Sequence, residues 1–416
     1  MTALLLLLAL QEDPQPWIDD LSKDDITARE TAGKKLVDIG IAALPKLEKL
    51  GANSGGELRE RVLHLMAAIL LNEKRAVVMR SDTKVTIDLK ETPLRDAMKR
   101  LQEASGFEVW VDEAVDNRPV TLALKDLPYL DALTRICRAH GALRIKSLYD
   151  DYSHTPAAFW RMEKPGRARF TLVAGKSTHE PMHHIGPFRV SVSAVAVYRL
   201  SQAHVTEFSM TVAALWPPNL APIGVENLVV DVLQDGQGRS LIPPNGLRSS
   251  EAGSPADGPA DRLWDMTSSI SLAKAPDTKT LSRYEGRLPL WFAARRDKVR
   301  INTPASRVNE AIQVGDYSIK IASIEGGEIE IVATMIAGTA WPRKTRIPTL
   351  GLTARFFDES GAEIVLTSSF AYAPGKIKVP LKKGQSIAAI EVTGAADLFR
   401  LEVPFQFKDV PIPQWP

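Results

Sequence analysis

A phrase that occurs twice within residues 83–147 constrains the fold of this chain more than any other feature. The first copy, "VTIDLKETPLRDAMKRLQEASG", begins with alternating apolar residues, changes to apolar residues at helical spacing, and ends at Gly106. The second copy, "PVTLALKDLPYLDALTRICRAHG", changes period in the same way and ends at Gly141. A period of two indicates a strand, and a period of 3.6 indicates a helix. Each copy is therefore predicted to be a strand followed directly by a helix.

Two short apolar segments complete this region. "FEVWVDE" follows the first helix and "ALRIKSL" follows the second, so the predicted order is β-α-β-β-α-β. Thr92 is predicted to cap the first helix, with Pro93 at its first position. This order and the repeated "L-K-x-x-P-L-x-x-A-L" phrase, in which Met98 replaces the usual Leu, resemble the short N-terminal domain of secretins and TonB-dependent receptors. The resemblance implies a non-catalytic periplasmic adaptor domain that contacts other proteins, and it supplies no catalytic residues.

Residues 16–80 have a helical period throughout. Asp24 or Asp25 is predicted to cap the first long helix, which ends at Gly40, and "IAALPKLEKLG" forms a second helix that ends at Gly51. A third helix follows in "GELRERVLHLMAAILL". The pattern resembles a HEAT repeat, but only about one and a half repeats are visible, whereas solenoids generally need at least three. We therefore expect this segment to pack against a neighbour.

The chain becomes rich in strand patterns from about residue 167. The run that starts at "FRVSVSAVAVYR" is echoed in order by the run that starts at "DYSIKIASIEG", which indicates an internal duplication. Each half contains an Asp-x-x-Gly sequence, Asp235–Gly238 and Asp358–Gly361, predicted to form hairpin turns and not calcium loops. Residues 243–262 are rich in Pro, Gly and Ser and are predicted to be a surface loop.

These patterns together predict a multidomain α+β fold. Its expected parts are an N-terminal helical pair in 16–80, a β-α-β-β-α-β adaptor domain in 83–147, and two tandem, mainly antiparallel β-sandwich domains in 167–305 and 312–411.

Residues 1–11 include the apolar run "TALLLLLAL". A run of about eight apolar residues is far below the roughly 20 needed to cross a bilayer, and it matches the apolar core of a signal peptide. We therefore expect export to the periplasm or cell surface and no transmembrane span in the mature chain; a misassigned start or a buried N-terminal segment is the alternative. The net charge of +2 and the dispersed Lys and Arg residues argue against a nucleic-acid partner.

The densest histidine cluster lies in "STHEPMHHIGPF", residues 177–188. His179, Glu180 and His183 match the H-E-x-x-H pattern of zinc proteases, in which both histidines lie on one face of a helix. Pro181 cannot donate a backbone hydrogen bond inside such a helix, so we predict a polar loop with no metal or other cofactor. The alternatives are a metal-dependent hydrolase at these residues, or a loop metal site that also recruits His184 or His154.

Other reactive or aromatic residues have structural interpretations. Cys137, the only cysteine, is predicted to be a buried, inert thiol, and His140 is predicted to interact favourably with the end of the same helix. The acidic pair in "YDDY", residues 149–152, is expected to be solvated. Four tryptophans in the strand-rich region suggest either packing, which we favour for Trp216, Trp291 and Trp341, or a carbohydrate-binding face: Trp216, Trp264, Trp291 and Trp341.

The favoured function is therefore a non-enzymatic one, with no catalytic residues. We expect an exported envelope protein that acts as an interaction or scaffold module and binds an envelope partner through its adaptor domain or an edge strand of a sandwich. The alternatives are the metal-dependent hydrolase and a carbohydrate-binding surface protein. The oligomeric state is left open.

Overall fold

The structure is a computed structural model in which the chain has a mixed α/β fold with several antiparallel sheets. It divides into two compact units, Met1–Arg80 and Ser81–Pro416. The structure describes residues 12–145, 170–175, 181–200, 205–217, 220, 222–244, 247–249, 265–272, 276, 278–325, 328–336, 352–364, 370–373, 376–380 and 386–412. The predicted loop at 243–262 and the "YDDY" pair fall mostly or wholly outside these residues.

The first unit is helical, as predicted. Its helices are α2 (Gln15–Asp20), α3 (Ile26–Ile39), the short 3-10 helix η1 (Gly40–Ala43), α4 (Leu44–Asn53) and α5 (Gly56–Arg80). Their buried apolar side chains form one core: Ile18, Leu21, Ala32, Leu36, Ala43, Leu47, Val62 and Ile69.

Local sequence signals set most ends of these helices. The carboxylate of Asp25 accepts a hydrogen bond from the backbone N–H of Thr27 at 2.8 Å and so caps α3, and α3 ends before Gly40. The prediction that the second helix ends at Gly51 is wrong, because α4 continues to Asn53. Gly51 lies inside that helix at a close approach to α5, where a Cβ atom would lie 3.1 Å from Val62.

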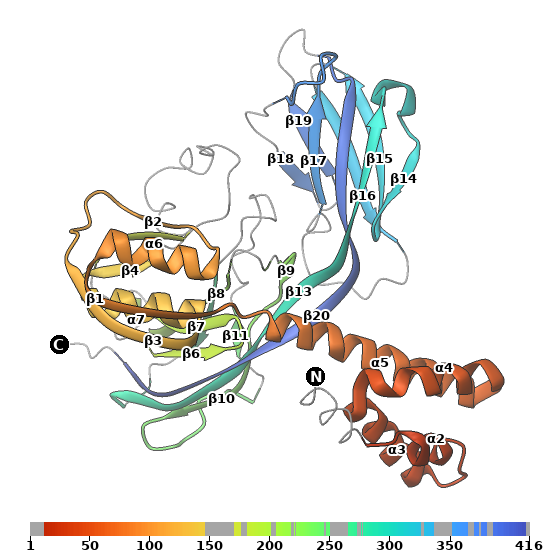
Figure 1. Ribbon diagram of the computed structural model, residues 1–416, viewed down its shortest axis with the longest axis horizontal. Helices are drawn as coiled ribbons and strands as arrows, with labels where there is room; N and C mark the ends of the chain where they lie inside the picture. Colours follow the sequence, from red (N-terminus) through yellow and green to blue (C-terminus); the bar gives the residue numbers. More distant parts are fainter. Residues whose placement is uncertain are drawn as a thin grey trace. The chain divides into compact units, whose positions relative to one another are not determined.

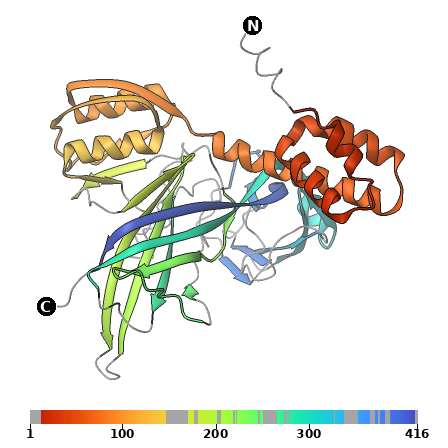
Figure 2. The same ribbon diagram turned by 90° about the horizontal axis from the view of Figure 1, so that it is seen from below.

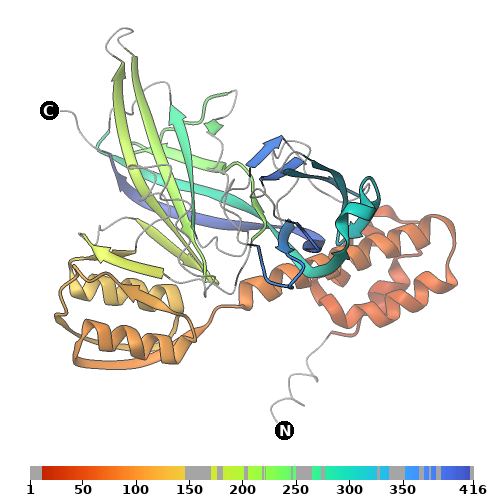
Figure 3. The ribbon, with the colours of Figure 1, turned by 90° about the horizontal axis from the view of Figure 1, so that it is seen from above.

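The region with the repeated phrase has the predicted β-α-β-β-α-β order. The elements are β1 (Lys84–Pro93), α6 (Leu94–Ser105), β2 (Val109–Val111), β3 (Pro119–Pro128), α7 (Tyr129–His140) and β4 (Leu143–Ile145). Strands β1 and β3, one from each copy of the phrase, pair antiparallel. Helices α6 and α7 lie side by side (Figures 1 and 3).

Two details of this region differ from the sequence-based prediction. Thr92 does not cap α6: it is the penultimate residue of β1, and the N–H of Arg95 is bonded by the side chain of Asn117 at 2.9 Å. A further strand, β5 (Phe170–Ala174), pairs with both β2 and β4 and adds Phe170 and Leu172 to the same core. Residues 170–174, assigned above to the first sandwich, therefore belong to the same compact region as β1 to β4.

Three five-stranded sheets make up the rest of the second unit. The first has the order β11-β12-β8-β7-β6 and contains β6 (Met182–Ile185), β7 (Phe188–Leu200), β8 (Val205–Leu215), β11 (Arg248–Ser249) and β12 (Asp265–Leu272). The second has the order β14-β15-β16-β19-β18 and contains β14 (Ala311–Val314), β15 (Tyr317–Glu325), β16 (Glu328–Met335), β18 (Phe370–Ala373) and β19 (Lys376–Pro380). The third has the order β10-β13-β20-β17, with β9 also paired to β13, and contains β9 (Gly224–Val225), β10 (Val229–Asp235), β13 (Thr280–Asn302), β17 (Leu352–Phe357) and β20 (Ala389–Pro411).

Strands β13 and β20 connect the two predicted halves. They pair antiparallel from Thr280 opposite Pro411 to Asn302 opposite Ala389 (Figures 1 and 2). Strand β10 pairs with the beginning of β13, and β17 pairs with the beginning of β20. The end of β13, from the first half, therefore pairs with the beginning of β20, from the second half, and the end of β20 pairs with the beginning of β13. The boundary predicted between the two sandwich domains, at residues 305–312, lies between β13 and β20 in sequence. The two strands nevertheless belong to one sheet.

The two Asp-x-x-Gly sequences form matching hairpin turns, as predicted. The N–H of Gly238 donates to the carbonyl of Asp235 at 2.9 Å, and Gly361 donates to Asp358 at 3.0 Å. In each turn the aspartate side chain also accepts two backbone N–H groups, from Gln237 and Arg239 and from Ser360 and Ala362. These matching bonds satisfy the carboxylates without a cation.

Candidate functional site

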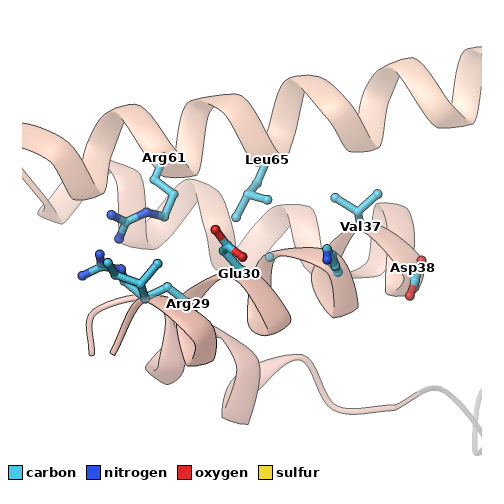
Figure 4. A pocket seen from close by; sticks show the side chains of 9 residues that line it. Arg29, Glu30, Val37, Asp38, Arg61 and Leu65 are labelled. Carbon is cyan, nitrogen blue, oxygen red and sulfur yellow. The ribbon is translucent and has the colours of Figure 1, made fainter. Parts of the chain in front are cut away.

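A groove lies between α3 and α5 of the helical unit and has a volume of about 560 Å³. Seven of its lining residues come from α3 and two from α5: Ile26, Arg29, Glu30, Gly33, Lys34, Val37, Asp38, Arg61 and Leu65. Figure 4 shows these side chains around the space between the two helices. The sequence analysis did not predict this groove.

The face of α3 that lines the groove contains one residue without a side chain, Gly33, between Glu30 and Val37. Ile26, Gly33 and Val37 are separated by seven and four residues, so they lie along one stripe of the helix. A Cβ atom at Gly33 would lie 3.3 Å from Leu65 Cδ2, tighter than most packed contacts. Gly33 is buried, so the missing side chain allows α3 and Leu65 of α5 to approach each other closely at this point.

Charged residues of both signs line the groove along its length. Arg29 and Arg61 lie at one end and Asp38 at the other, with Glu30, Val37 and Leu65 between them (Figure 4). The guanidinium of Arg29 donates to the carbonyl of Lys23 at 3.1 Å. That of Arg61 donates to the carbonyl of Leu21 at 2.8 Å and pairs with Glu57. These bonds fix both cations on the loop that precedes α3.

Exposed apolar side chains are concentrated in the same unit. Of the six exposed large hydrophobic residues in the described parts of the chain, five lie in the helical unit: Ile26 (62% exposed), Ile41 (53%), Leu63 (54%), Leu70 (45%) and Val77 (55%). Leu63, Leu70 and Val77 are seven residues apart on α5, so they form one stripe along that helix.

The described part of the histidine cluster forms a strand. His183 and His184 lie in β6 and pair with Val190 and Arg189 of β7, so the predicted loop is in fact the first strand of a hairpin. The H-E-x-x-H pattern of zinc proteases requires both of its histidines on one helix, whereas His183, its second histidine, lies in a strand. His179, Glu180 and His154 lie outside the described residues. Within the described ranges no three His, Cys, Asp or Glu side chains are grouped as metal ligands would be.

His184 lies where β6 meets α7. Its Nδ1 atom is 3.9 Å from the carboxylate of Asp131, and Arg189 of β7 donates to the hydroxyl of Thr134 at 3.1 Å. Burial lowers the pKa of His184 to about 4, although the charge of Asp131 acts in the opposite direction. The imidazole is therefore neutral at pH 7, and the Asp131 contact is not an ion pair at that pH.

Two predicted structural residues on α7 are buried. Cys137 is 5% exposed, which confirms that its thiol is buried, and this burial raises the pKa of the thiol to about 12. His140 is also buried, at 6% exposed, and its Nε2 lies 2.8 Å from a carboxylate oxygen of Asp116. The imidazole of His140 therefore contacts the carboxylate of Asp116. His140 also lies in the last turn of α7, where the sequence predicts a favourable interaction with the end of the helix.

The described tryptophans of the strand-rich region belong to the interior. Trp291 is 4% exposed and Trp216 is 1% exposed, which confirms the core assignment of Trp291 and leaves neither available as a sugar-stacking surface. The indole N–H of Trp291 donates to Glu226 at 2.6 Å, and Glu226 also accepts from Arg400 of β20 at 3.1 Å. Trp264 and Trp341 lie outside the described residues.

Comparison with known proteins assigns no family. No protein-family model matches this chain, and no curated protein matches it significantly. Within the described residues no helix is both long enough and apolar enough to cross a membrane.

Proposed function

We propose that this chain is a non-enzymatic, exported envelope protein that acts as a scaffold and binds a partner protein through its helical unit. The observation that carries the proposal is the concentration of exposed large hydrophobic side chains in residues 12–80. Contiguous exposed apolar surface marks interaction sites, because its exposure to water is unfavourable. Burial of one such side chain contributes about 1.5–3 kcal/mol, which offsets part of the free-energy cost of association.

The arrangement of α2 to α5 supports this proposal. A stack with the pattern of a HEAT repeat buries both faces of each helix pair only when further pairs pack against it. Here one pair and a long third helix share one small core, and a stripe on α5 and one end of α3 remain exposed. A partner protein is the source of the missing contacts in this proposal.

The rest of the chain is inferred to act as the scaffold. We infer an adaptor domain of the kind that the repeated phrase resembles, followed by two β-sandwiches that share β13 and β20. The resemblance to secretin and TonB-receptor domains, together with the apolar run in residues 1–11, supports export to the periplasm or cell surface.

An edge strand of the sandwiches is a weaker candidate for the binding surface. The carbonyl of Pro289 in β13 accepts the N–H of Glu226, so the backbone of Pro289 faces away from β20. Pro289 pairs with Glu402, and Pro404 lies two residues further along β20, so the backbone of Pro404 faces away from β13. Pro404 has no N–H to donate there, and a proline at this position opposes pairing with an added strand.

Site-specific photo-crosslinking tests the proposal. A photoreactive amino acid is placed at Leu63, Leu70 or Ile41 of the full chain, and separately at Gln406, an exposed residue of β20, in cells that express the protein naturally. We expect a discrete crosslinked protein from the helical positions and none from Gln406. The absence of any protein crosslink at all three helical positions would refute partner binding through this unit. Cell fractionation of the same samples tests export, which is refuted if the chain stays in the cytoplasm.

A further inference from the structure

We propose that His184 makes the joint between the two-helix region and the first sheet sensitive to acid. The two-helix region is formed by β1 to β5, α6 and α7, and the first sheet is the one that contains β6, β7 and β8. Protonation of His184 separates the two parts while each stays folded. This inference goes beyond partner binding by the helical unit, because the joint lies wholly within Ser81–Pro416.

Three residues in one row form the sheet side of the joint. His184 of β6 lies directly opposite Arg189 of β7, and Arg189 lies directly opposite Leu215 of β8. Residues that lie directly opposite each other in an antiparallel pair point to the same face of the sheet, with Cβ atoms about 4.5–5.5 Å apart. The row therefore places an imidazole beside a guanidinium on the face that meets α7.

One stripe of α7 forms the helix side of the joint. Asp131, Thr134 and Arg138 are spaced at i, i+3 and i+7, so they lie on one face of the helix. The carboxylate of Asp131 lies 3.9 Å from Nδ1 of His184, and the hydroxyl of Thr134 accepts a hydrogen bond from the guanidinium of Arg189 at 3.1 Å. These contacts between α7 and the β6–β7 hairpin are polar.

Apolar burial contributes little to the joint. Within the described residues, Leu215 is the single residue of the first sheet that belongs to the buried core of the two-helix region. The first sheet packs instead against β13, where the ring of Phe188 contacts that of Phe292 with centroids 6.5 Å apart. Each part therefore keeps its own core when the joint opens, and a change in one charge can shift the equilibrium between closed and open states.

Protonation of His184 adds a cation at a place with few anions. Its imidazole is 21% exposed, and its Nε2 atom is buried with no hydrogen-bond partner among the described residues, so an added N–H has no acceptor there. The carboxylate of Asp131 is already paired with Arg135 at 3.2 Å. The charged and titratable groups that act on the imidazole come from all three elements: Asp131 and Arg138 of α7, Arg189 of β7 and His183 of β6.

The pKa of His184 sets the size of the effect. Burial, together with the charges of Arg189 and Arg138, lowers this pKa to about 4 in the closed joint, whereas the exposed imidazole of an open joint has its ordinary pKa of 6.5. Closure is therefore fully favoured above pH 6.5 and loses free energy as the pH falls towards 4. The difference of about 2.5 between the two pKa values corresponds to a fall of about 300-fold in the ratio of closed to open molecules, of which about 30-fold is reached at pH 5.

The distance between two spin labels tests the joint in the full chain. The labels are attached to Lys99→Cys in α6 and Lys408→Cys in β20, both exposed positions, while the native Cys137 is buried. We expect one narrow distance distribution at about pH 8 and a second, broader population that grows between pH 6.5 and 4. A single distribution that stays unchanged down to pH 4 overturns the proposal. Circular dichroism over the same range should stay constant, and a simultaneous loss of helix and strand signal would show unfolding instead of separation, which also overturns it.

Three variants assign the response to His184. His184→Gln, which does not titrate, is expected to keep one distance distribution down to pH 4. The control His64→Gln, at an exposed histidine of α5, is expected to respond like the wild type. Arg138→Gln removes one cation beside the imidazole from an exposed position of α7, so it is expected to show a smaller open population at pH 5. An acid response that persists in His184→Gln overturns the proposal; if that variant is already open at about pH 8, an unchanged response in Arg138→Gln overturns it.

Discussion

The shared strands β13 and β20 predict that the two strand-rich halves unfold together, and Gly315→Ala tests this. Gly315 forms the turn between β14 and β15 and packs on the backbone of β20. A Cβ atom there would lie 2.3 Å from the carbonyl oxygen of Ala395 and 2.9 Å from that of Gly394. Neither contact is relieved by a side-chain rotation, so the hairpin has to move away from β20.

The expected loss in the free energy of unfolding of Gly315→Ala has two parts. Gly315 has φ of +61°, and an L-residue in this left-handed region costs about 1–2 kcal/mol. Overpacking against backbone adds about 1–3 kcal/mol. The contact is closer than any normal packing distance, so we expect a loss of about 4 kcal/mol in the free energy of unfolding. Gly361→Ala is the matched control: φ is +81° and a Cβ atom would meet nothing within 4 Å, so only the first part, about 1–2 kcal/mol, applies.

Urea unfolding of the full chain, followed by hydrogen exchange, measures both effects. We expect Gly315→Ala to lower the protection of β10 in the first half as well as that of β17 in the second, because each pairs with one of the two long strands. Equal losses for Gly315→Ala and Gly361→Ala would refute the close packing of the hairpin on β20. A loss of protection confined to the second half would refute the shared-strand argument.

Three other predictions follow from the described side chains. The pKa of His184 is lowered to about 4 in the folded chain from its ordinary 6.5, so its contribution to stability is complete above pH 6.5 and is lost as the pH falls towards 4. In His184→Phe the free energy of unfolding should therefore depend less on pH between 6.5 and 4. An unchanged pH dependence would contradict the burial of His184. Cys137, with a pKa raised to about 12, should react with a thiol reagent at pH 8 only at the rate of unfolding, and rapid labelling of the folded chain would show that the thiol is accessible. Elemental analysis of the purified chain should find no stoichiometric zinc in the wild type or in His183→Ala; stoichiometric zinc that is lost in His183→Ala would revive the hydrolase alternative.

The sequence predicted correctly the ends of those helices that depend on neighbouring residues. Helices α6 and α7 end at Gly106 and Gly141 as expected, because these glycines directly follow the last residues of the apolar period. The cap of α6 was predicted wrongly because the oxygen that accepts the hydrogen bond from the backbone N–H of Arg95 belongs to Asn117, which is 22 residues away in sequence. Strand β5 was assigned to the wrong region because residues 146–169 separate it in sequence from β4, its partner.

Long-range pairing also explains the other differences. The sequence pattern of β13 is apolar only as far as Ala294, and "RRDKVRIN" continues it with charges on exposed positions. The strand continues to Asn302 because its backbone pairs with β20, and backbone pairing does not require apolar side chains on the solvent face. The groove could not be predicted from the sequence because it depends on how α3 packs against α5, a contact between residues far apart in the chain.

A comparison of two hairpins shows that the histidine pair in β6 is not needed to form its hairpin. Strand β6 and β7 are joined by a turn at Gly186, with φ of +52°, just as β14 and β15 are joined at Gly315. In the second half the equivalent strand is Ala311–Val314, which contains no histidine and no acidic residue. The same hairpin therefore forms without any metal-binding side chain, since backbone pairing and the glycine turn are sufficient. In the first half, His184 lies beside Asp131 of α7. Variants of His183 and His184 should therefore alter the contact between β6 and α7 and leave the hairpin itself intact.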